Sequence, residues 1–219
     1  DALPIWLPGW RHELLVLTPH EVPVPRAVTE AGEVHRGGHP YPDAAGEAGA
    51  VRLLELAGSL GGDDLLVLLL SGGASALLAA PRPGLELGDV EATTRGLLRA
   101  GAPITAVNTV RRQLLAAGGG GLARAAFPAR VVTLVLSDVI GDTLADIGSG
   151  PTVASPTGPA EALAVLVDHR LAEWVPDRVI AHLKRAEDAP DAAWAEHTRT
   201  ETLAGNRTPS LFMHPAEGS

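Results

Sequence analysis

Two long apolar runs, each followed by a serine, constrain the fold of this chain more than any other feature. Residues 65–70 are all leucine or valine, and residues 131–136 differ from that composition by a single threonine. Runs of this kind, bounded by turn-forming residues, predict strands that are buried on both faces of a parallel sheet. A shorter apolar run at residues 14–18 predicts a third buried strand.

Helical segments are predicted between and after these strands. Asp43 stands where a helix N-cap is expected, ahead of residues 44–59 with their apolar side. Alternation of strands and helices is typical of an α/β fold with a parallel sheet, in which ligands bind beyond the carboxyl ends of the strands. Residues 76–80 are helix-prone, and further helices are expected at 89–100, 105–117, 159–168 and 176–187, with a short one ending at residue 126.

The composition excludes several classes of protein. The 219 residues suffice for one large domain, which we expect to span residues 1–219. Lys and Arg number 17 against 26 for Asp and Glu, and the net charge of −9 disfavours a nucleic-acid partner. The absence of cysteine excludes a disulfide scaffold and thiolate metal sites. No apolar run approaches the ~20 residues of a membrane-spanning helix and no secretory signal is visible, so we expect a cytoplasmic protein without a membrane partner.

A glycine-rich stretch, Ser-Gly-Gly-Ala-Ser, directly follows the first long strand at residues 71–75. Glycines let the backbone approach an oxyanion, and successive N–H groups with the start of a following helix attract negative charge. Ser71, Gly72, Gly73 and Ser75 are therefore candidates for a phosphate-binding cradle; the alternative is a tight turn that needs small residues. The stretch matches neither a Walker A loop nor a dinucleotide fingerprint.

Two carboxylates and a second glycine-rich turn follow the second long strand. Asp138 and Asp142 could hold Mg²⁺ beside phosphate groups, because that ion is typically held by one or two carboxylates plus substrate oxygens. Alternatively, Asp138 caps the local turn and Asp142 faces solvent. Ser149, Gly150 and Thr152 are candidates for a second oxyanion contact, with an ordinary turn as the alternative.

Three polar residues outside these turns are further candidates. Asn108 and Arg111 are spaced to share one face of a helix. Arg111 could pair with a carboxylate or a phosphate, or it could be a solvated surface arginine. His39 could act as a base or a ligand, or only as a hydrogen-bonding group of its loop. The other histidines show no metal-binding spacing.

Taken together, these segments resemble the N-terminal domain of the type 2 glycerate kinases, the MOFRL-type family that is often labelled hydroxypyruvate reductase. The likeness lies in stretches that follow one another in the family's order. They read GHPYPD at 38–43, SGGASALL at 71–78, NTVR at 108–111, LSDVIGD at 136–142 leading to SGPT at 149–152, and GNR at 205–207.

The resemblance implies a Rossmann-like α/β domain, with a mostly parallel sheet flanked by helices, and ATP-dependent phosphorylation of D-glycerate to 2-phosphoglycerate with Mg²⁺. Under it, Asp138, Asp142 and Arg111 are the catalytic residues, and the two aspartates orient Mg²⁺ or the attacking hydroxyl. The implied partners are D-glycerate and ATP, and a homo-oligomer is compatible with it. The phosphate- and substrate-binding residues are Ser71, Gly72, Gly73, Ser75, Asn108, Ser149, Gly150, Thr152 and Asn206.

The sequence departs from the family pattern at its lysines. Gly118 stands where the family usually has the lysine of Lys-Gly-Gly, and the one lysine of the chain, Lys184, lies in a predicted tail helix. The family's Gly-Lys-Ala turn and its C-terminal MOFRL domain have no counterpart here. Loss of a well-placed cation can cost phosphoryl transfer about 10³-fold or more in rate. We therefore expect a fragment, a frameshifted product or a degenerate copy with little activity by itself.

Two other functions stay open at this point. A non-catalytic domain that binds a nucleotide or a small acid, or that assembles with a partner, would explain the glycine at position 118. An NAD(P)-dependent hydroxypyruvate reductase is disfavoured, because no Gly-x-Gly-x-x-Gly with a following acidic residue is present.

Overall fold

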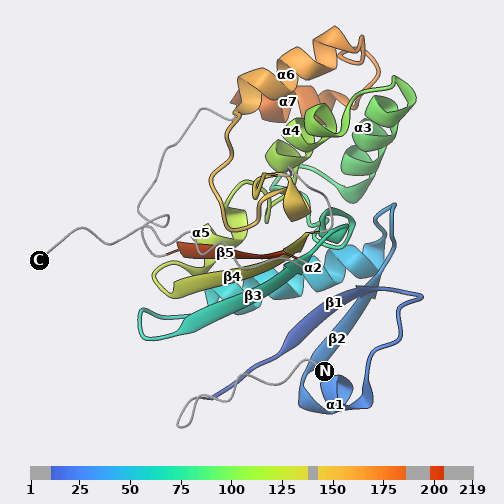
Figure 1. Cartoon of the computed structure of the whole chain (residues 1–219). Coiled ribbons are helices and arrows are strands. Elements are labelled where there is room, and N and C mark those ends of the chain that lie inside the picture. The colour runs from blue at the N-terminus through green and yellow to red at the C-terminus, as the bar shows by residue number, and fades with distance from the viewer. Residues whose placement is uncertain (1–10, 138–142, 186–197, 205–219) are drawn as a thin grey trace, which may run out of the picture.

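The fold is built on parallel strands. The structure, a computed structural model, describes residues 11–137, 143–185 and 198–204. Within them, neighbouring strands pair in parallel in two sheets, which confirms the predicted α/β class (Figure 1). One sheet pairs β1 (Leu15–Pro19) with β2 (Glu33–Gly37), and the other has the order β3 (Leu65–Ser71), β4 (Arg130–Ser137), β5 (Thr198–Ala204).

The helices lie close to where the apolar spacing predicts them. The Asp43 side chain accepts a hydrogen bond of 2.8 Å from the Gly46 amide and so caps α2, as expected. α1 lies in a proline-rich segment in which no helix was predicted. The helices are α1 (Arg26–Ala31), α2 (Ala44–Gly58), α3 (Leu87–Arg99), α4 (Ile104–Leu114), α5 (Gly121–Ala126), α6 (Pro159–Asp168) and α7 (Asp177–Arg185).

The helix expected at residues 76–80 is absent, and that prediction is wrong. Only a three-residue 3₁₀ turn, η1 (Ala74–Ala76), forms there. The following backbone is bound by the end of α4 instead: the Ala80 carbonyl accepts from the Ala116 amide at 2.8 Å, and the Arg82 amide donates to the Leu114 carbonyl at 2.8 Å. These long-range bonds hold the segment extended, as does the bridge between Pro81 and Leu115.

Two hydrophobic cores stabilise the fold. One lies among α3, α4, α6 and α7, with Leu97 and Leu166 fully buried at its centre. The other lies between the larger sheet and the helices α2 and α5, around Leu70 and Leu122. Figure 1 shows the four helices of the first core gathered apart from the sheets. No helix within the described residues is long and apolar enough to cross a membrane.

The larger sheet is covered on one face, whereas the sequence predicts strands buried on both. Leu70 and Val135 are paired in register and point into the core beneath α2 and α5. Leu69 is 65% exposed and Leu136 is 55% exposed on the opposite face. Among the described residues no helix packs on that face, so the prediction of double burial is wrong for β3 and β4.

Candidate functional site

The carboxyl ends of β3 and β4 lie side by side and place two predicted binding segments together. Ser71 at the end of β3 is in register with Leu136 of β4. The turn at residues 71–75 and the loop that follows β4 therefore leave the sheet from neighbouring points. This is the position at which parallel sheets bind ligands.

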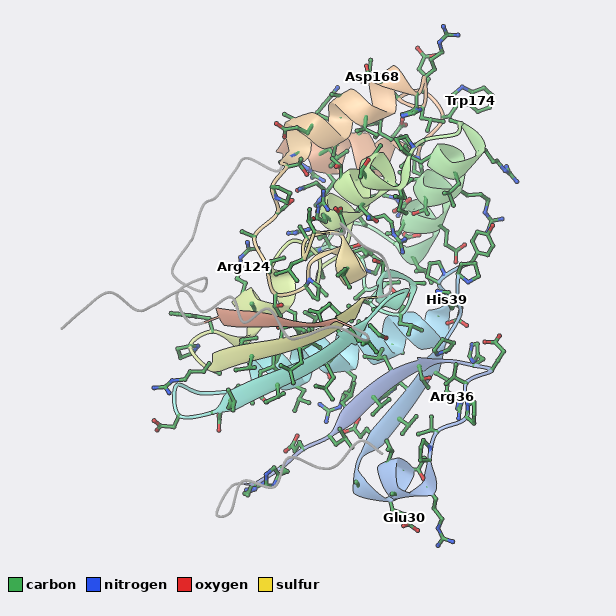
Figure 2. The ribbon with its side chains drawn as sticks, in the orientation of Figure 1. Glu30, Arg36, His39, Arg124, Asp168 and Trp174 are labelled. Atoms are coloured by element: carbon green, nitrogen blue, oxygen red, sulfur yellow. The ribbon has the colours of Figure 1, made fainter. Side chains whose placement is uncertain are left out.

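The first segment is a glycine turn against a histidine. Gly73 has a φ of +80°, a conformation that favours glycine, and a Cβ there would lie 2.6 Å from Nε2 of His39. His39 thus packs on the turn from the loop after β2 (Figure 2). Because only η1 follows, the turn has no full helix behind it, and the predicted helix-dipole contribution is absent.

The second segment is a loop with an unusual backbone. Gly148, Ser149 and Gly150 have φ values of +60°, +64° and +61°, and Ser149 is fully buried. A serine in the left-handed region is strained, and such strain persists only where the surroundings enforce it. The Ser149 hydroxyl lies 2.8 Å from the Ser75 hydroxyl. The structure therefore joins the two predicted segments through their serines.

The glycine run at residues 118–121 holds the second segment in place. The Gly119 amide donates to the Ser149 carbonyl at 2.9 Å, and the Gly120 amide donates to the Gly150 carbonyl at 2.7 Å. A Cβ at Gly121 would lie 1.9 Å from the Ala116 carbonyl oxygen, so a side chain cannot be accommodated without movement. The glycines thus build the site's frame as well as interrupting the helix.

Thr152 is tied to the sheet. Its hydroxyl lies 2.7 Å from the Thr133 hydroxyl of β4, and both residues are buried. The structure therefore places Thr152 beneath the loop, where it anchors the second segment.

A buried ion pair that the sequence analysis missed fixes the loop to α4. Arg112 is 3% exposed and donates to Asp146 Oδ1 at 2.9 Å and to the Ala145 carbonyl at 3.1 Å. Burial raises the pKa of Asp146, but hydrogen bonds from Thr143 and Arg112 outweigh it and hold that pKa below its ordinary value. The signal available in the sequence is that Arg112 is one turn from Asn108 on an amphipathic helix.

Asn108 and Arg111 belong to the same region. Asn108 is buried, and its amide lies 3.5 Å from the Asp146 carbonyl and carboxylate oxygens. Arg111 is half-buried rather than a solvated surface residue, and its Nε has no hydrogen-bond partner among the residues that the structure describes. Burial lowers the pKa of the Arg111 guanidinium. A guanidinium whose Nε is buried without a partner in the described part of the chain would be stabilised by an anion.

Three predicted site residues, Asp138, Asp142 and Asn206, lie outside the described residues. Within the described ranges, no group of three or more His, Asp or Glu side chains could hold a metal ion. The Mg²⁺ site therefore stays a prediction.

Comparison with known proteins gives consistent matches over most of the chain. Residues 6–184 match the family described as a domain of unknown function, DUF4147. The chain is 49% identical to a Danio rerio glycerate kinase over 141 residues, which are 64% of this chain and 28% of that protein. It is 42% identical over 173 residues, 79% of this chain and 38% of the other, to an Agrobacterium vitis protein that bears the provisional name hydroxypyruvate reductase.

A solved structure shares the fold. The crystal structure of a glycerate kinase from Thermotoga maritima superposes with a TM-score of 0.73 at 32% identity, over 87% of this chain and 44% of that one. The chain thus spans less than half the length of these relatives.

Proposed function

The chain belongs to the DUF4147 family, and from that premise we propose that it forms the substrate-binding part of a glycerate kinase. The reaction transfers the terminal phosphoryl group of ATP to the 2-hydroxyl of D-glycerate and yields ADP and 2-phosphoglycerate. The observation that carries the proposal is the 2.8 Å contact between Ser75 and Ser149. It brings together two glycine-rich segments that are both suited to bind oxyanions.

The serine segments would position the phosphate or the carboxylate of the substrate. Phosphoryl transfer depends mainly on alignment and on neutralisation of charge, with little covalent chemistry by the protein. Hydroxyls and backbone amides at Ser71–Ser75 supply uncharged donors, and the buried segment Gly148–Gly150 supports them through the contact of Ser149 with Ser75. Such donors orient oxygen atoms without a large desolvation cost, and a fixed backbone keeps them aligned before the substrate binds.

Arg111 would supply positive charge at this site. Its guanidinium is half-buried and its Nε lacks a partner within the described part of the chain. A guanidinium can bind a carboxylate or a phosphate through two parallel hydrogen bonds. We assign it the carboxylate of glycerate or the transferring phosphate, while Arg112 is committed to Asp146.

Mg²⁺ would be held by Asp138 and Asp142, which follow β4 in the sequence. Carboxylate oxygens are the donors that this ion prefers, and the bound ion would neutralise charge on the phosphate groups. In the double variant D138N/D142N, the gain in ATP affinity on adding Mg²⁺ should be at least tenfold smaller than in the unaltered chain. Titration of ATP with and without Mg²⁺ measures that difference.

The proposal is tested by calorimetric titration of the chain with D-glycerate and with ATP–Mg²⁺. Arg111→Gln should weaken glycerate or ATP binding at least tenfold, because a charge-assisted hydrogen bond is lost. Arg130→Gln, at the opposite end of β4, serves as the matched control and should bind as the unaltered chain does. If the unaltered chain binds neither D-glycerate nor ATP–Mg²⁺, the proposal is contradicted.

A second candidate is a non-catalytic domain that binds the same small molecules. It is favoured because Gly118 has no side chain that could neutralise a transferring phosphate, and because the one lysine of the chain, Lys184, lies on α7. An assay couples ADP formation to D-glycerate. Turnover would exclude the non-catalytic domain, whereas binding without ADP formation is the result expected of both candidates, because the first is proposed as the substrate-binding part alone.

A further inference from the structure

A groove on the outer side of α3 collects arginines. Arg95 and Arg99 of α3 line it together with Arg170 and Trp174 from the turn between α6 and α7. We name these four residues the arginine groove. Its volume is about 690 Å³, within the range of small-molecule sites. None of its residues takes part in the hydrogen bonds that join the two serine segments.

Among the described residues, the arginine groove carries more positive than negative charge. In the described part of the chain, no carboxylate forms an ion pair with Arg95, Arg99 or Arg170, whereas Arg112 and Arg178 both have acidic partners. Glu91 is the one acidic residue that also lines the groove. Since the whole chain has a net charge of −9, this local excess of positive charge stands out from its surroundings.

The floor of the groove is made of small residues. Gly88, Ala92, Gly96 and Ala100 follow one another at intervals of four along α3 and face the groove. Leu171 packs against Gly96, since a Cβ there would lie 3.6 Å from the leucine side chain. A Cβ at Gly88 would meet nothing within 4 Å, so a ligand can approach the helix backbone closely at that end of the floor.

Arg170, which lines the groove, has an unfavourable backbone conformation. It follows α6 with a φ of +56°, where helices commonly end in glycine. Its amide donates to the Val167 carbonyl at 2.9 Å, and the Leu171 amide donates to the Leu166 carbonyl at 2.7 Å. The turn is therefore well bonded although an arginine is a poor choice for it, and a residue that retains such strain is a candidate for function.

Aromatic rings are available beside the arginines. Trp174 is 82% exposed and lies at the outer edge of the helical group (Figure 2). Tyr41 is 54% exposed, and the Arg95 guanidinium lies 5.4 Å from the centre of its ring. An indole exposed to this extent gains by stacking on another aromatic ring.

We propose that the arginine groove binds a nucleoside polyphosphate, at a site separate from the serine segments. The guanidinium groups of Arg95, Arg99 and Arg170 bind the phosphates, and the Trp174 indole stacks on the base. Phosphates suit guanidinium groups because the hydrogen bonds can be bidentate, and bases stack on indole rings. The site does not depend on the proposed kinase reaction.

Titration calorimetry of the unaltered chain with ATP and with inorganic tripolyphosphate, both without Mg²⁺, tests this site. R99Q/R170Q should weaken the binding of both probes at least tenfold, because two charge-assisted contacts are lost. W174A should weaken ATP binding severalfold and leave tripolyphosphate unchanged, because only ATP has a base to stack. R26Q, another exposed arginine, is the control and should change neither affinity.

The outcomes distinguish this site from the serine segments. Loss of ATP binding in R99Q/R170Q, which leaves the serine segments unaltered, with binding kept in R26Q supports the proposal, even if no glycerate binds. Unchanged affinity in R99Q/R170Q, or absence of binding of both probes, overturns it. Equal affinity for ATP and tripolyphosphate with no effect of W174A overturns the assignment to a nucleotide. All variants alter exposed side chains, and unchanged circular dichroism and thermal unfolding show that they fold.

Discussion

At the scale of single residues, Ser149 shows how chemistry and backbone geometry combine in this site. Its position has a φ of +64° and no exposed surface, so glycine would fit the backbone better. The serine is instead bonded to Ser75 across a sequence distance of 74 residues. The hydroxyl pair links the two segments at the end of the sheet.

Replacing Ser75 by alanine should lower the free energy of unfolding by about 1–3 kcal/mol, because it leaves the buried Ser149 hydroxyl without this partner. Urea denaturation measures the change. In the double variant S75A/S149A the loss of unfolding free energy should be smaller than the sum of the two single-variant losses by about 0.5–1.5 kcal/mol. Strict additivity would show that the two hydroxyls do not interact in solution.

Arg112 is the residue whose loss should destabilise the site most. Arg112→Ala leaves Asp146 partly buried without its cation and should cost about 3–5 kcal/mol of unfolding free energy. Arg26→Ala, which removes an exposed arginine that pairs with the exposed Glu30, should change the free energy of unfolding little. Chemical denaturation compares the two variants, and equal effects would contradict the buried ion pair.

At the scale of secondary-structure elements, caps and long-range backbone bonds decide where helices begin and fail. Asp43 starts α2 as its sequence position predicts, since capping requires only local chemistry. Residues 76–80 favour a helix locally, yet bonds from Ala116 and to Leu114 hold the adjoining chain extended. Those partners are more than 30 residues away, so local preference could not reveal them.

The Asp43 cap predicts a pH dependence of stability. The hydrogen bond from His20, followed by that from the Gly46 amide, lowers the pKa of Asp43 from 3.8 to about 2. Because the folded pKa lies below the unfolded one, the contribution is present above pH ~4 and is lost as the pH falls toward ~2.

Asp43→Ala should therefore destabilise the fold by about 1 kcal/mol at neutral pH and by less near pH 2. Unfolding curves of both proteins at several pH values measure how the difference in unfolding free energy shrinks as the pH falls. Asp43→Asn keeps a capping acceptor and should lose only part of the stability. A constant difference across the whole range would refute the assignment.

At the scale of the whole molecule, the two hydrophobic cores divide the fold into a sheet region and a group of helices. Among the described residues, the sheet region shows burial on one side only, which follows from the packing of α2 and α5 on a single face. The side chains alternate along β3, so neighbouring leucines have opposite surroundings.

This alternation predicts a sharp contrast between adjacent positions. Leu70→Ala should cost about 2–5 kcal/mol of unfolding free energy, because it opens a cavity in the core. Leu69→Ala should cost less than about 1 kcal/mol, since that side chain is 65% exposed. Equal losses in urea denaturation would show that the second face is covered in solution.

The sequence by itself determined the parallel α/β class, most helices and the cap at Asp43, and it predicted a site after two strands. These depend on periodicity, local chemistry and strand-end geometry, which are visible along the chain. Only the tertiary structure decided that Ser75 meets Ser149, that Arg112 is buried against Asp146 and that none of the described helices covers the second face of the larger sheet. The physical reason is that these features depend on contacts between residues far apart in sequence, and on which faces the helices cover.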